Sequence, residues 1–214
     1  MEFREYGNGS AGIVLLQPVS GHDGEEIESE ISLIREKTAE DLCLVAIRVE
    51  SWNKDLSPWE APAVFGREPF GTGAAKTLAE ITAYCGKRPA EYFIGGYSLA
   101  GLFALWAAYQ SDMFAGVAAA SPSVWFPGFT DYMKENDIRC GNVYLSLGDR
   151  EEKTRNPVMA TVGGKICEAF DILKSRNVDC ILEWNKGNHF MDADLRTAKA
   201  FAWVMDRMRE KGRA

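Results

Sequence analysis

One stretch, residues 92–106, restricts the possible fold of this chain more than any other. It reads YFIGGYSLAGLFALW: an apolar segment, two glycines, Ser98 between Tyr97 and Leu99, and then an apolar run. A sharp turn from a strand into a helix needs such small neighbours, because the residue at its tip has a strained backbone. The turn lifts the serine hydroxyl above the sheet, and the helix directs its positive end at the same point. The stretch therefore predicts a nucleophile elbow; the alternative is a tight turn in a structural βα unit.

The pattern around the serine differs by one residue from the Gly-x-Ser-x-Gly that is usual in such turns. Residues 96–100 read Gly-Tyr-Ser-Leu-Ala, so Ala100 stands at the last position. Alanine is small, and we expect the turn to accommodate it.

The rest of the chain alternates buried-strand patterns with helical ones. Strands are predicted at residues 13–17, 42–49, 91–95, 114–120, 142–147 and 178–184. Helices are predicted after residue 23, around 78–85, at 99–109, from 156 to 173 and at 195–208, with irregular stretches at 50–73 and 121–128. This alternation predicts an α/β fold, a doubly wound and mostly parallel sheet of about six strands with helices on both faces. We expect a single domain spanning residues 1–214, with a minimal lid or none.

Composition and charge exclude several classes of partner. There are 31 acidic residues against 24 Lys and Arg, a net charge of −7, whereas nucleic acids and anionic membranes require a basic face. No apolar run reaches the roughly 18 residues of a membrane span, and no basic flank precedes an apolar segment as in a signal peptide. The five cysteines form no C-x-x-C pair, which favours reduced core thiols. We therefore expect a cytoplasmic protein that binds neither nucleic acid nor membrane.

Three polar segments follow predicted strands, where sheets of this kind bind ligands. Ser98 follows the third strand, an acidic loop at 148–152 follows the fifth, and His189 follows the sixth. Serine, acid and histidine in this order are typical of an α/β-hydrolase triad, in which the histidine takes the serine proton and the carboxylate fixes the histidine tautomer. The only other histidine, His22, follows the first strand, and we expect it at the surface or in a cap near the mouth of the site.

The identity of the acid depends on spacing within the acidic loop. The usual arrangement places it about three residues past the glycine that ends the strand, which selects Glu151. Asp149 is the next candidate and Glu152 the third. The alternative is a solvated acidic turn that pairs with neighbouring basic residues.

An acyl-transfer site also needs donors for the oxyanion. The backbone N–H of Leu99, directly after the nucleophile, is the first. The second is expected from the turn after the first strand, and because Pro18 has no N–H, Val19 is the candidate.

Aromatic residues gather in the two irregular stretches. Trp59 and Trp125 are candidates to line an acyl or alcohol pocket, since such pockets have apolar walls. The alternative is core packing. Ser123 is either a site hydroxyl or a turn former.

Several segments together resemble the esterase D-like family, which includes siderophore esterases and S-formylglutathione hydrolase. These segments are residues 53–58 (NKDLSP), 96–101 (GYSLAG), 120–125 (ASPSVW), 147–151 (LGDRE) and 187–190 (GNHF). The resemblance covers residues 12–205 and implies Ser98 as nucleophile, His189 as base and Glu151 as acid. The chain departs from the family at Gln17-Pro18, where His-Gly is usual, and lacks basic residues suited to a triply charged siderophore.

These observations predict a serine esterase that acts on a small-molecule ester through an acyl-enzyme, with neither cofactor nor metal. Within enzymes, the same triad could cleave a thioester or an amide. From another class, the chain could be a catalytically idle protein of this fold that binds a ligand or partner through its aromatic stretches.

Overall fold

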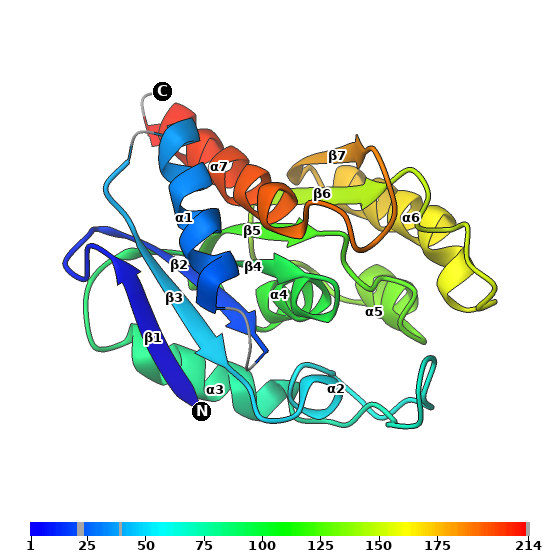
Figure 1. The fold of residues 1–214 in the computed structure, drawn as a ribbon. Helices are drawn as coiled ribbons and strands as arrows, with labels where there is room; N and C mark the ends of the chain where they lie inside the picture. Colours follow the sequence, from blue (N-terminus) through cyan, green and yellow to red (C-terminus); the bar gives the residue numbers. More distant parts are fainter. Residues whose placement is uncertain (21–23, 39, 213–214) are drawn as a thin grey trace.

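The computed structural model describes residues 1–20, 24–38 and 40–212, and these contain one sheet (Figure 1). Its strand order is β1-β3-β2-β4-β5-β6-β7, and β1 runs antiparallel to β3 while the other pairs are parallel. The strands are β1 (Glu2–Gly7), β2 (Ile13–Val19), β3 (Cys43–Arg48), β4 (Glu91–Tyr97), β5 (Phe114–Ala120), β6 (Asn142–Gly148) and β7 (Asp179–Asn185). The expected α/β architecture with a mostly parallel sheet is confirmed.

Helices cover both faces of this sheet, so the central strands are buried on both sides and are almost continuously apolar. On one face α1 (Gly24–Thr38) packs beside α7 (Ala193–Gly212). The other face is covered by α3 (Ala74–Cys85), α4 (Leu99–Gln110), α5 (Phe129–Glu135) and α6 (Val162–Ser175). The single turn α2 (Trp52–Asp55) and the 3₁₀ turn η1 (Met159–Thr161) lie in connections.

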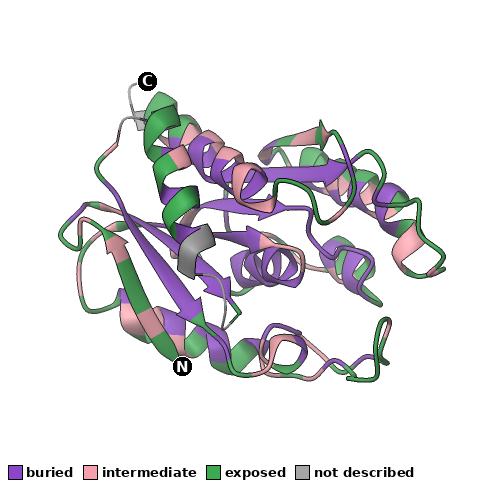
Figure 2. Ribbon diagram, in the orientation of Figure 1, coloured by how far each residue is buried: buried purple, intermediate pink, exposed green. Residues whose placement is uncertain are grey.

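The structure contains elements that the sequence patterns did not predict. The six predicted strands are present, and β1 adds a seventh at the edge of the sheet. Because β1 pairs only with β3, it keeps exposed charges at Glu2 and Arg4 and has no buried apolar run (Figure 2). The helix predicted from residue 156 instead begins at Val162, although Asn156 Oδ1 does accept the N–H groups of residues 158 and 159, at 3.0 and 3.2 Å. Neither α2 nor α5 was predicted.

The cysteines are all free thiols. Cys43, Cys85, Cys140 and Cys180 are buried, as expected, and burial raises the pKa of Cys85 to about 12. Cys167 is exposed, so the expectation of a core thiol is wrong there. None of the helices in the described part of the chain combines the length and apolar character of a membrane span.

Candidate active site

The predicted turn between strand and helix is present, with Ser98 at its tip. Strand β4 ends at Tyr97 and α4 begins at Leu99, which leaves Ser98 with φ of +59° and ψ of −120°. Such a backbone costs on the order of 1–3 kcal/mol and persists only where the surroundings hold it. Here the Ser98 N–H donates to the Ala120 carbonyl at 3.1 Å, and the Ser123 N–H donates to the Ser98 carbonyl at 3.0 Å.

Close packing within the turn explains the unusual alanine. A Cβ on Gly96, whose φ is +152°, would lie 2.7 Å from the Cβ of Ala100. A Cβ on Gly101 would lie 2.9 Å from the Gly96 carbonyl. Ala100 fits because the residue that faces it is a glycine.

Three side chains from the carboxyl ends of separate strands form a hydrogen-bonded chain. Ser98 Oγ lies 3.0 Å from His189 Nε2, and His189 Nδ1 lies 2.7 Å from Glu151 Oε2. The Glu151 side chain is 4% exposed and that of His189 23% exposed, so the acid is buried behind the imidazole. The Tyr97 hydroxyl donates to the His189 carbonyl at 2.8 Å, which ties the histidine loop to the strand before the serine.

The acidic loop after β6 contributes Glu151 to this hydrogen-bonded series, whereas its Asp149 binds backbone. Asp149 Oδ1 accepts the Gly187 N–H at 2.8 Å, so this carboxylate fixes the start of the histidine loop. Glu152 is exposed. Within the described part of the chain, Glu151 is the one of the three candidate acids that hydrogen-bonds to His189.

The other carboxylate oxygen of Glu151 has three donors of its own. Oε1 accepts the Gly148 N–H at 2.7 Å, the Ser121 hydroxyl at 2.8 Å and Nη1 of Arg196 at 3.0 Å. Burial alone would raise the pKa of Glu151, but hydrogen bonds from His189, Ser121 and Gly148 outweigh it and hold the pKa below its ordinary value. The residue is therefore an ionised hydrogen-bond acceptor for the imidazole.

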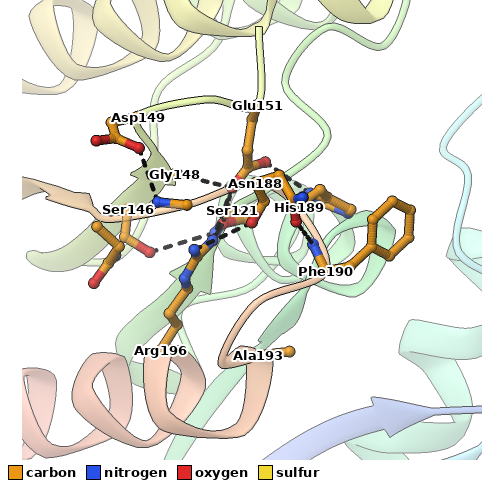
Figure 3. A network of polar contacts seen from close by, with 12 residues as sticks. Ser121, Ser146, Gly148, Asp149, Glu151, Asn188, His189, Phe190, Ala193 and Arg196 are labelled. Carbon is orange, nitrogen blue, oxygen red and sulfur yellow. Dashed lines mark hydrogen bonds and ion pairs between the residues drawn. The ribbon is translucent and has the colours of Figure 1, made fainter. Parts of the chain in front are cut away.

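Sequence reasoning missed Arg196 and Ser121. Arg196 lies on the buried face of α7, one turn before the buried Ala200, with its guanidinium directed at Glu151 and Ser121 (Figure 3). A charged residue on the apolar face of a helix is the signal that could have identified it. The signal for Ser121 is its position directly after β5, at the same edge of the sheet as Ser98.

A cavity of about 360 Å³ opens beside Ser98, between the carboxyl ends of β2 and β4 and the first turns of α1 and α7. Its described lining residues are Gln17, Pro18, Val19, Ser20, Ile27, Glu30, Trp52, Tyr97, Ser98, Ala193, Asp194 and Thr197. Apolar side chains share this lining with two acidic ones, Glu30 and Asp194. A cavity of this size suits a small ligand.

The predicted oxyanion donors lie at this cavity or next to it. Leu99 is the first residue of α4, and Val19 is a lining residue. The Val19 carbonyl accepts the Val49 N–H at 3.4 Å on the β3 side. In a trans peptide the C=O and the next N–H point in opposite directions, so the Ser20 N–H faces β4. The backbone thus favours Ser20 as the second donor, while Val19 stays the prediction from sequence.

The three predicted substrate-binding residues have different surroundings. Ser123 Oγ lies 3.3 Å from Ser98 Oγ, in a residue only 2% exposed. Trp59 donates to the Pro127 carbonyl at 2.9 Å and packs within an aromatic cluster, and Trp125 packs against Phe65 and Phe70. Neither tryptophan is among the described residues that line the cavity. Trp52, which the sequence did not single out, is one of them.

His22 lies outside the described residues. Among those that are described, no group of three or more His, Cys, Asp or Glu side chains is arranged to hold a metal ion.

Several solved structures share this architecture. An IroE-like serine hydrolase from Shewanella oneidensis matches 94% of this chain and 74% of its own, with a TM-score of 0.73 and 13% identity. Siderophore hydrolase EstA from Aspergillus nidulans matches 95% of this chain and 85% of its own (TM-score 0.64, 18% identity). The enterobactin esterase FES from Shigella flexneri matches 96% of this chain and 55% of its own (TM-score 0.65, 14% identity).

The chain therefore has the α/β-hydrolase fold, as the resemblance predicted. No protein-family model and no curated protein matches its sequence. At identities of 13–18% the structural likeness establishes the fold, and the activity has to be argued from the site.

Proposed function

We propose that the protein is a serine hydrolase that cleaves carboxylic esters. The observation that carries this proposal is the chain from Ser98 Oγ to His189 Nε2 and from His189 Nδ1 to Glu151, at 3.0 and 2.7 Å, on a strained elbow. A serine hydroxyl is a weak nucleophile until a base takes its proton, and the base works best when a carboxylate fixes its tautomer. The fold shared with solved esterases supports the same reaction class.

In the acylation step, His189 Nε2 accepts the Ser98 proton as Oγ attacks the ester carbonyl. The Leu99 N–H, at the positive end of α4, and a second N–H from Val19 or Ser20 bind the oxyanion. The imidazolium formed on His189 is stabilised by the buried carboxylate of Glu151. When the tetrahedral intermediate collapses, His189 gives its proton to the departing alcohol.

Deacylation repeats these steps with water as the nucleophile. His189 takes a proton from water, which attacks the acyl carbonyl, and then returns the proton to Ser98 as the acid leaves. This sequence regenerates the enzyme, and every proton is transferred through His189.

The cavity beside Ser98 indicates the size of the substrate. Its volume of about 360 Å³ lies near the lower end of the range for ligand pockets, roughly 300–1,000 Å³. Val19, Ile27 and Trp52 supply apolar walls that suit a short acyl or alcohol group. We infer a small, mainly apolar ester.

Labelling with a fluorophosphonate tests the proposal, because this probe traps an activated serine. We expect labelling of the native protein at Ser98 and none in Ser98→Ala. Ser175→Ala, which removes an exposed serine from the end of α6, is the matched control and should be labelled as the native protein is. Folded native protein that stays unlabelled, or Ser98→Ala labelled equally, would contradict the proposal.

Hydrolysis of p-nitrophenyl acetate separates an enzyme from an idle binding protein of this fold. The native protein should release p-nitrophenol catalytically, with Ser98→Ala at the uncatalysed background. A native rate equal to that of Ser98→Ala favours the binding protein.

A further inference from the structure

The guanidinium of Arg196 is buried within the candidate site but takes no part in the reaction steps above. The residue is 1% exposed. Its Nη1 donates to Glu151 Oε1 at 3.0 Å, to the Tyr97 hydroxyl at 3.0 Å and to Ser121 Oγ at 3.3 Å. One nitrogen of Arg196 thus contacts the triad acid and residues from the ends of β4 and β5.

Nη2 of the same guanidinium binds the loop that carries the histidine. It donates to the carbonyls of Lys186 and Asn188, at 3.1 and 3.2 Å. Asn188 directly precedes His189. Figure 3 shows the side chain rising from α7 toward Glu151 and this loop. A single planar group therefore fixes the acid and the base relative to each other.

Physical chemistry argues against a role in packing alone. Burying a guanidinium costs several kcal/mol unless its donors are satisfied, and apolar side chains of similar volume often stabilise a core as well or better. Arginine is distinctive in offering five donors in a rigid fork. At Arg196 the two terminal nitrogens of this fork contact five acceptors across the site.

We propose that Arg196 is a positioning residue: it fixes the Glu151 carboxylate and the His189 loop relative to each other and balances the negative charge of the carboxylate. This inference rests on the proposed esterase function and extends it to a residue that does not contact the reacting atoms. Its two parts, geometry and charge, can be separated by substitution.

The titratable and charged side chains around His189 come from three elements. They are Tyr97 from β4, Asp149 and Glu151 after β6, and Asp194 and Arg196 at the start of α7. Among the described residues, Glu151 is the acid in contact with the imidazole, and Arg196 is the cation in contact with Glu151. The charge that His189 experiences therefore depends on this pair.

The test compares Arg196→Met, which removes the charge and the donors, with Arg196→Lys, which keeps the charge but cannot reach Glu151 and both loop carbonyls. Arg209→Met makes the same change at an exposed position of α7 and is the matched control. For each folded variant, kcat, KM and the pH profile of kcat/KM are measured with p-nitrophenyl acetate.

Arg196→Met should lower kcat about 100-fold, the effect of a misplacement near 1 Å, with little change in KM because Arg196 does not line the cavity. Without the cation, the uncompensated carboxylate favours the imidazolium. The acidic limb of the profile should therefore move to higher pH. Arg196→Lys should lower kcat but leave the acidic limb at its native pH. Arg209→Met should match the native protein in both kcat and the acidic limb.

Three results would overturn the inference. The first is a native kcat in either Arg196 variant, and the second is an unchanged acidic limb in Arg196→Met. The third is an effect of Arg209→Met on kcat or on the acidic limb as large as that of Arg196→Met. If Arg196→Met does not fold, the kcat of Arg196→Lys decides the geometric part. Failure of the proposed function is distinguishable, because the native protein itself would then neither react with fluorophosphonate nor hydrolyse the ester.

Discussion

The hydroxyl of Ser121 donates to Oε1 of Glu151 across 2.8 Å, from a backbone held at a φ of +42°. Ser121 is the first residue after β5, and Glu151 lies in the loop after the neighbouring strand β6. A positive φ is unfavourable for serine, so the structure retains strain at the position that supplies this donor. The bond orients Oε1 of the Glu151 carboxylate, while its other oxygen, Oε2, faces His189.

Replacing this donor should destabilise the protein. Ser121→Ala leaves a buried carboxylate with one hydrogen bond fewer, and hydrogen bonds to charged groups contribute about 1.5–3 kcal/mol. We expect urea unfolding to show a loss of about 2 kcal/mol, against less than about 0.5 kcal/mol for the exposed Ser175→Ala. Equal stabilities of the two variants would show that the bond contributes nothing.

The two acids on the loop after β6 should differ sharply in their effect on turnover. Glu151→Gln keeps the shape but favours the wrong histidine tautomer, so kcat should fall by about 10⁴, as in other triads. Asp149→Asn keeps an oxygen that can accept the Gly187 N–H, and its kcat should stay within about tenfold of native. Steady-state hydrolysis of p-nitrophenyl acetate measures both. A larger loss in Asp149→Asn would reassign the acid.

The sequence was sufficient to predict the parts of the site that follow local rules. An elbow needs small residues next to its serine, and parallel strands bring their following loops to one edge, so the order of Ser98, Glu151 and His189 along the chain predicted their meeting. The spacing from Gly148 selected Glu151 for the same reason, because a short loop limits where a side chain can reach.

The parts that sequence could not predict depend on packing between distant segments. Arg196 meets Ser121 and Glu151 across 75 and 45 residues of chain, and no periodic pattern encodes such contacts. Aromatic composition likewise cannot tell a core residue from a pocket wall, so Trp59 and Trp125 were proposed for the cavity that Trp52 lines. The edge strand β1 lacks the apolar run that identifies central strands.

Away from the site, Glu168 should make stability depend on acid pH. Hydrogen bonds from Lys134 and Lys165, at 2.6 and 2.8 Å, lower its pKa to about 2. A lowered pKa in the folded state means that the stabilisation is complete above the unfolded pKa, about 4.3, and is lost as pH falls toward 2. The side chain is 30% exposed, so solvent screening keeps this below about 1 kcal/mol.

Chemical denaturation at several pH values measures this contribution. The stability difference between the native protein and Glu168→Gln should be constant from pH 7 to 5 and should shrink between pH 4 and 2. Glu210→Gln, which removes an exposed acid near the end of α7, should show a smaller change. A difference that grows on acidification would contradict the sign of the pKa shift.

The charge of the cavity should set the preferred charge of the substrate. Asp194 is among its lining residues, and none of the described lining residues is lysine or arginine. Like charges brought together cost several kcal/mol, and about 1.4 kcal/mol corresponds to a factor of ten. Methyl butanoate, methyl 3-aminopropanoate and monomethyl succinate end in a methyl, an ammonium and a carboxylate group and otherwise match. We expect kcat/KM for the succinate ester to be at least about tenfold below that of the butanoate, with the amino ester at or above it.

Substitution of Asp194 tests whether the cavity causes this order. Asp194→Asn keeps the side chain's shape and removes one negative charge at the wall, so the penalty on monomethyl succinate should shrink while hydrolysis of methyl butanoate changes little. Asp171→Asn removes an equal charge from an exposed position on α6 and should leave the ratio of the two rates at its native value. An effect of the same size in both variants would assign the preference to net charge. An unchanged ratio in Asp194→Asn would remove this carboxylate from the determinants of specificity. The same electrostatics implies that a triply charged siderophore ester should be hydrolysed more slowly than a neutral ester of similar size.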